Sequence, residues 1–102
     1  MNAEYAPIIV PFLDRHNDYI RIYVRRLSNG EYIVTDLGET VTDLRLCGLE
    51  ETAILEALGR AATTYHADYT KTTDEVFIRT TEEKLQGAKR DLVQSLLILA
   101  RL

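Results

Sequence analysis

The sequence predicts an α+β domain in which a small antiparallel sheet packs against two main helices. Apolar and polar residues alternate over Tyr19–Leu37 around the dipeptide Asn29-Gly30, a pattern typical of a β-hairpin. Two later segments, over 50–65 and 81–101, repeat apolar residues at helical spacing. A chain of 102 residues has the usual length of one domain, so we expect a single domain over 1–102.

Composition limits the classes of function. The chain is 46% hydrophobic and 27% charged, which is typical of a globular protein that folds. Its formal net charge of -4 argues against a general attraction to nucleic acid or to an anionic membrane. Because Cys47 is the only cysteine, an intramolecular disulfide is excluded, and we expect a thiol packed in the core. The N-terminus lacks the features of a signal peptide, so we expect a cytoplasmic protein without membrane contact.

The first half of the chain predicts strands. Pro11 limits the run Ile8–Leu13 to an edge strand or an irregular entry into the sheet. The strands Tyr19–Leu27 and Glu31–Leu37 then form a hairpin, and a two-residue loop at Asn29-Gly30 would pair Val24 with Thr35. In that register one face is mostly aliphatic. The other face carries tyrosine, arginine and acidic side chains: Tyr19, Arg21, Tyr23, Arg25, Tyr32, Val34 and Asp36.

The second half predicts helices around another hairpin. A short helix begins at Glu39 or Thr40, runs through Leu46 and stops at Gly48, and a longer one covers Glu50–Tyr65. Segments 67–71 and 75–79 read as a second, short hairpin. The last helix begins near Thr81 and is apolar nearly all round, more than one sheet face should bury. We therefore expect a homodimer that buries one side of this helix: Leu92, Val93, Leu96, Leu97 and Leu99.

The segment from Asp14 to Tyr19, called here the polar corner, is the first candidate site. Asp14, His16 and Asp18 leave one face of the backbone if the segment is extended. With Asp36 they could serve a metal-dependent nuclease or phosphodiesterase, because carboxylate and imidazole suit divalent transition ions. The alternative is structural: the two aspartates cap turns while Asn17 bonds to nearby backbone. The structural alternative is favoured, and we assign no metal, no cofactor and no catalytic residue.

The tyrosine and arginine face is the second candidate. Its tyrosines could stack bases while Arg15, Arg21 and Arg25 contact phosphates, as in sheet proteins that bind single strands. The acidic balance of the chain and Asp36 on the same face speak against nucleic acid. Tyrosine and arginine are also the residues that protein interfaces favour. A protein partner is therefore the preferred interpretation, and nucleic acid is kept as an alternative.

The run Phe12–Val24, followed by Tyr32–Leu44 and then Leu46–Gly48, resembles the bacterial and phage family called domain of unknown function 1828. The resemblance covers about the first half of the chain. It implies a small intracellular protein, often from a prophage or another mobile element, and implies no particular activity. Leu37 departs from a pattern that tends to be acidic there. The positions that carry the resemblance are Asp14, Arg15, His16, Asn17, Asp18, Tyr19, Thr35, Asp36, Gly38, Asp43 and Leu44.

We therefore expect a non-enzymatic protein-binding module of phage or mobile-element type. Its partner would meet the polar corner and the tyrosine and arginine face together. Inhibition of a host defence enzyme or of a nucleic-acid-handling enzyme is an extension of this hypothesis. The alternatives are a metal-dependent nuclease or phosphodiesterase and a single-stranded nucleic-acid binder.

Overall fold

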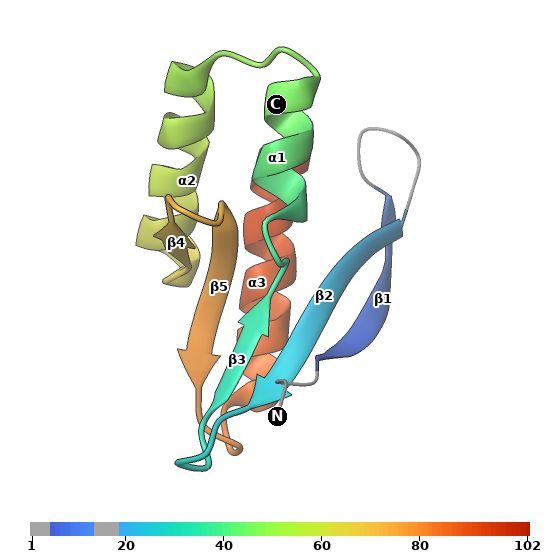
Figure 1. The fold of residues 1–102 in the computed structure, drawn as a ribbon, viewed down its shortest axis with the longest axis vertical. Coiled ribbons are helices and arrows are strands. Elements are labelled where there is room, and N and C mark those ends of the chain that lie inside the picture. The colour runs from blue at the N-terminus through green and yellow to red at the C-terminus, as the bar shows by residue number, and fades with distance from the viewer. Residues whose placement is uncertain (1–4, 14–18) are drawn as a thin grey trace.

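The computed structural model describes residues 5–13 and 19–102 of the chain. Its elements follow one another in an order that separates two groups of strands by two helices (Figure 1). They are β1 (Ala6–Leu13), β2 (Tyr19–Arg26), β3 (Tyr32–Thr35), α1 (Glu39–Leu46), α2 (Glu51–Tyr65), β4 (Asp68–Thr70), β5 (Glu75–Thr80) and α3 (Leu85–Ala100).

The strands that the structure describes form one antiparallel sheet of five, in the order β1-β2-β3-β5-β4. This confirms the predicted α+β class, although the sheet is larger than two separate small hairpins. The second hairpin joins the first because β5 pairs with the whole length of β3. Strand β1 is an edge strand, as Pro11 indicated, and the three-residue β4 forms the other edge.

The helices lie on one side of this sheet. Helix α3 crosses β2, β3 and β5, and α2 packs chiefly against α3 rather than against the strands. In Figure 1, α3 runs behind the sheet, and none of the described helices crosses the near face of β2, β3 and β5. Helix α3 therefore lies between the sheet and α2, and none of the described helices covers the other sheet face.

The middle position of α3 explains its composition and corrects a prediction. The five side chains expected at a homodimer interface are buried within the chain: Leu92 0%, Val93 6%, Leu96 1%, Leu97 8% and Leu99 0% exposed. A helix between a sheet and another helix must be apolar on both sides. These residues belong to the core, so the prediction that they form an interface is wrong.

The first hairpin has a different register from the predicted one. Val24 pairs with Val34, and Tyr23 pairs with Thr35, one residue away from the expected alignment. The loop has three residues, because the N–H of Leu27 donates to the carbonyl oxygen of Glu31 at 2.7 Å and Gly30 adopts φ +88°. A glycine at this third position is the usual way to close a three-residue hairpin.

This change of register moves the second strand to the opposite face. Since side chains alternate along a strand, a shift of one residue exchanges the two faces. Val34 and Asp36 therefore point toward the helices and are 0% and 1% exposed. Tyr32 lies on that side too. Its Cα partner Arg26 alternates along β2 with Ile22 and Val24, which point toward the helices. The prediction that these three residues share a face with Tyr23 is wrong.

A tight turn links β3 to α1. Leu37 has φ +57° and Gly38 has φ +82°, both in the left-handed region that favours glycine. A Cβ atom at Gly38 would collide with the carbonyl oxygen of Thr73 in the turn between β4 and β5. Gly38 is therefore required by conformation and by close backbone packing at once.

The helix ends agree with the prediction for α1 and, within one residue, for α2, but not at the start of α3. Helix α1 covers Glu39–Leu46 and is followed by Gly48 at φ +82°, as expected. Helix α3 begins at Leu85 rather than near Thr81, because a turn precedes it in which the N–H of Leu85 donates to the carbonyl oxygen of Glu82. Cys47 is exposed at the end of α1, so its expected place in the core is wrong.

Arg45 joins three elements through its guanidinium group. It donates to both carboxylate oxygens of Asp74 at 2.6 Å and to Glu51 at 2.8 and 3.0 Å. The Tyr69 hydroxyl donates to Asp74 at 2.7 Å. This network links α1, α2 and the turn between β4 and β5. The hydrogen bond from Tyr69, followed by those from Arg45, holds the pKa of the Asp74 carboxyl below its usual value.

Alanine substitutions at three glycines separate backbone conformation from steric collision. Gly48→Ala meets open space at φ +82° and should destabilise the protein by about 1 kcal/mol. Gly38→Ala has a similar φ and also the collision with Thr73, so it should cost at least about 1 kcal/mol more. Gly59→Ala, at an exposed position of α2, should stabilise the protein by about 0.5–1 kcal/mol. Urea unfolding measures all three, and equal losses for Gly38→Ala and Gly48→Ala would contradict the packing argument.

The stabilising effect of Asp74 should depend on pH. Because its pKa is lowered in the folded protein, its charge stabilises the fold above the ordinary value of 3.8 and ceases to do so as the pH falls below that value. Asp74→Asn should therefore be less stable than wild type at pH 7 and closer to wild type in stability at a pH near 2 in urea unfolding. Asp68→Asn, an exposed carboxylate of β4, is the matched control. A difference that is the same at both pH values would rule out the charge as its cause.

Candidate functional site

The sheet face opposite α3, called here the uncovered face, is the candidate site. Its members follow from the register, since residues paired across strands point to the same side. Tyr23, Thr35 and Phe77 form one row across the three central strands, and Arg25, Ile33 and Arg79 form the next. Further residues extend the face toward the edges: Pro7, Ile9, Tyr19, Arg21, Asp68, Thr70 and Glu75.

Large apolar and aromatic groups on this face reach solvent. Ile9 is 65% exposed and Tyr19 is 59% exposed. Tyr23, Ile33 and Phe77 are half-buried, because each lies among neighbouring strands of the sheet. Exposed apolar groups that are gathered on one face, rather than scattered, are the mark of a surface that meets another molecule.

Polar contacts hold several of these side chains in place. The Tyr23 hydroxyl donates to Glu39 of α1 at 3.1 Å, and the Arg79 Nε donates to Glu31 at 2.9 Å. The guanidinium carbon of Arg25 lies 5.4 Å from the centre of the Tyr5 ring, a cation–π distance. Burial, with the hydrogen bond to Glu39, raises the pKa of the Tyr23 hydroxyl. The face therefore presents partly fixed aromatic and cationic groups.

The arginines of the uncovered face differ in how far they are satisfied. None of the ion pairs among the described residues involves Arg21 or Arg25. The Nε atom of Arg25 is buried and has no hydrogen-bond partner in the described part of the chain. A buried donor without an acceptor lowers stability by about 1–3 kcal/mol, so the Arg25 side chain is incompletely satisfied within the described residues.

Asp36, a predicted site residue, has a structural role instead. Its Oδ1 accepts hydrogen bonds from the backbone N–H groups of Gly38 at 2.8 Å and Val76 at 3.0 Å, and its Oδ2 accepts from Thr40 at 3.0 Å. Burial raises the pKa of this carboxyl, and the three N–H donors oppose that effect. Asp36 caps the start of α1 and ties it to β5, which leaves no free oxygen pointing to a partner or a metal ion.

The neighbouring Thr35 takes part in the same turn. Its hydroxyl donates to Glu75 at 2.7 Å and accepts a hydrogen bond from the N–H of Leu37 at 3.0 Å. Thr35, Asp36 and Gly38 all carry the resemblance noted in the sequence. In this structure they share one role, which is to build the connection from β3 to α1.

Leu37, expected on the aliphatic core face, lies outside it. It is 38% exposed, and the expectation of burial is wrong because its left-handed conformation turns the side chain out of the strand. It forms one wall of a hollow of about 410 Å³ beside α1, with the 82% exposed Leu46 as another wall. Glu39, Thr42 and Asp43 complete the rim, and Leu44 is buried in the core.

Three of the predicted site residues come together on this face, and two others, Tyr32 and Asp36, lie elsewhere. Tyr19, Arg21 and Tyr23 lie along one side of β2 on the uncovered face. Tyr32 lies on the helix side, and its hydroxyl donates to Glu82 at 3.3 Å. The rest of the polar corner is outside the described residues: Asp14, Arg15, His16, Asn17 and Asp18.

Three members of this face, Phe77, Arg79 and Ile33, were not among the predicted site residues. Phe77 and Arg79 alternate with Val76 and Ile78 along β5, so their sharing one side of a strand was visible in the sequence. Phe77 and Arg79 share rows with Tyr23 and Arg25 only because β5 pairs with β3. That pairing joins segments about 45 residues apart in the sequence. Nothing in the local sequence pattern specifies that pairing.

Residues 5–13 and 19–102 contain neither a metal-binding cluster nor a membrane-spanning helix. No group of three or more histidine, cysteine, aspartate or glutamate side chains there is arranged to hold a metal ion. In the same part of the chain, no helix has both the length and the apolar character needed to cross a membrane. The metal-site hypothesis also loses Asp36, whose carboxylate oxygens are occupied by backbone donors.

Comparison with known proteins gives one match. A family model described as "Domain of unknown function DUF1828" matches residues 10–98. No curated protein and no solved structure matches the chain.

Proposed function

We propose that this chain, which belongs to the family of unknown function whose model covers residues 10–98, is a non-enzymatic protein-binding module. The observation that supports this proposal is the uncovered face, one whole side of a five-stranded sheet within the described residues. Aromatic side chains and arginine, both common at the centres of protein interfaces, occupy its central rows.

The charges of the face favour a protein partner over a polyanion. Arg21, Arg25 and Arg79 supply positive charge, and Glu75 and Asp68 lie on the same side of the sheet. A surface of mixed sign is suited to a partner that also carries both signs. The partner is another protein or a second copy of the chain, which would use this face instead of the buried terminal helix.

The single-stranded nucleic-acid hypothesis remains the second candidate, for a specific reason. Tyr19, Tyr23 and Phe77 offer rings on one face, with three arginines between and beside them. Base stacking on such rings contributes about 1–3 kcal/mol per base. The net charge of -4 and the carboxylates of the same face oppose this candidate.

A phage or mobile-element origin and the inhibition of a host defence or nucleic-acid-handling enzyme extend the proposal. Both rest on the sequence resemblance. Neither changes which surface is proposed to meet the partner.

Charge reversal on the uncovered face tests the proposal. The tagged chain is crosslinked in its own cells, and the partner identified in this way is purified for calorimetry. Arg25→Glu and Arg79→Glu should each weaken binding of that partner at least about tenfold, which corresponds to about 1.4 kcal/mol. Arg60→Glu, on an exposed position of α2, is the matched control and should change the affinity less than about twofold.

Two results would count against this function. Equal affinities for wild type and both face variants would place the binding site elsewhere. Steeply salt-dependent binding of a single-stranded oligonucleotide, weakened by Tyr23→Ala, would favour the nucleic-acid candidate instead.

A further inference from the structure

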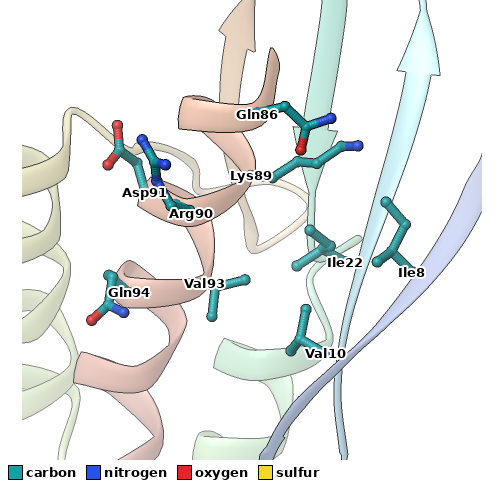
Figure 2. Close-up of a pocket in the computed structure, with 9 residues that line it drawn as sticks. All are labelled: Ile8, Val10, Ile22, Gln86, Lys89, Arg90, Asp91, Val93 and Gln94. Atoms are coloured by element: carbon teal, nitrogen blue, oxygen red, sulfur yellow. The ribbon is translucent and has the colours of Figure 1, made fainter. Parts of the chain in front are cut away.

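We propose that a cleft between β1 and α3 binds a small amphipathic carboxylate, an organic acid with an apolar chain. The cleft has a volume of about 500 Å³, within the range of sites that hold small organic ligands. It lies on the helix side of the sheet, away from the uncovered face, and the proposal is therefore independent of the proposed function (Figure 2).

The cleft exists because the sheet is wider than the helix that covers it. Helix α3 packs across β2, β3 and β5, and β1 extends the sheet beyond the edge of the helix. Ile8 pairs with Ile22, so both point to the helix side. Ile22 lies under α3 and is 1% exposed, but Ile8 and Val10 remain half-buried at the edge.

Aliphatic side chains line the inside of the cleft. Ile22 and Val93 are buried at its base, and Ile8 and Val10 form the wall on the strand side. Figure 2 shows these four side chains turned toward the space between α3 and the strands. An alkyl chain placed there would be removed from water against these four side chains, which favours binding.

Polar groups stand at one end of this apolar space. Lys89 and Gln86 extend from α3 toward the strands, above Ile8 and Ile22 in Figure 2, and Arg90 and Asp91 point away from them. None of the ion pairs among the described residues involves Lys89. The lining thus places an ammonium group and an amide next to the aliphatic part of the cleft.

The charge of the lining selects an anion. The residues that line the cleft include two cationic side chains, Lys89 and Arg90, and one carboxylate, Asp91. Only Lys89 of these is directed into the opening. An ammonium group at the end of an apolar cleft complements a carboxylate whose chain lies against the aliphatic wall.

Decanoate is the probe for this site, at concentrations below those at which it forms micelles. Titration into the full chain, followed by two-dimensional NMR, should give saturable shifts at Ile8, Val10, Ile22 and Val93. Lys89→Gln should weaken decanoate binding about fivefold, the effect of one partly exposed ion pair, and leave binding of decanol unchanged.

Lys71→Gln, in the turn between β4 and β5, is the matched control and should bind decanoate as wild type does. The proposal is overturned if decanoate produces no saturable shifts or if Lys89→Gln binds it as wild type does. It is also overturned if the cleft signals move on dilution of the protein alone, because a second copy would then be the occupant.

Discussion

The carboxylate of Asp36 is the interaction on which the arrangement of this protein depends. It accepts hydrogen bonds from three backbone N–H groups, two in the turn that starts α1 and one in β5. The N–H of Asp36 also donates to the carbonyl oxygen of Val76. These bonds fix where the chain leaves β3 and where β5 joins it, so that α1 turns toward α3. All the described helices then lie on one side, and the other face stays uncovered.

This arrangement separates two surfaces with different chemistry. The uncovered face is broad, carries aromatic groups with charges of both signs, and suits a macromolecule. The cleft beside β1 is narrow and apolar with one cation at its end, and suits a small ligand. Both result from a sheet of five strands that carries a single helix, α3, across its centre within the described residues.

Local sequence patterns predicted most of the elements but not how they are joined. Alternation, the glycine after α1 and the proline in β1 identify a strand or a helix end wherever they occur. Asn29-Gly30 fits a loop of two or of three residues, and only the bonds between Leu27 and Glu31 distinguish the two. The resulting error of one residue moved Tyr32 and Asp36 onto the wrong face.

The candidate site was predictable where it depends on one strand and not where it depends on long-range contacts. Tyr19, Arg21 and Tyr23 alternate within β2, so their common face follows from periodicity alone. The contribution of Phe77 requires the strand order. The apolar stripe of the last helix predicts an interface with a second chain. In the structure, α2 from another part of the same chain packs against this stripe instead. An apolar composition indicates that both sides of a helix are buried, but it does not identify the elements that bury them.

Unfolding of Asp36 variants in urea tests the central claim most directly. Asp36→Ala removes the acceptor for three backbone N–H groups, two of them in buried hydrogen bonds, and should lower the free energy of unfolding by about 3 kcal/mol or more. Asp36→Asn keeps one acceptor oxygen but sets an amide donor against the N–H of Thr40, and should lose about 1–3 kcal/mol. Free energies for both variants within about 0.5 kcal/mol of wild type would contradict the role assigned to this carboxylate.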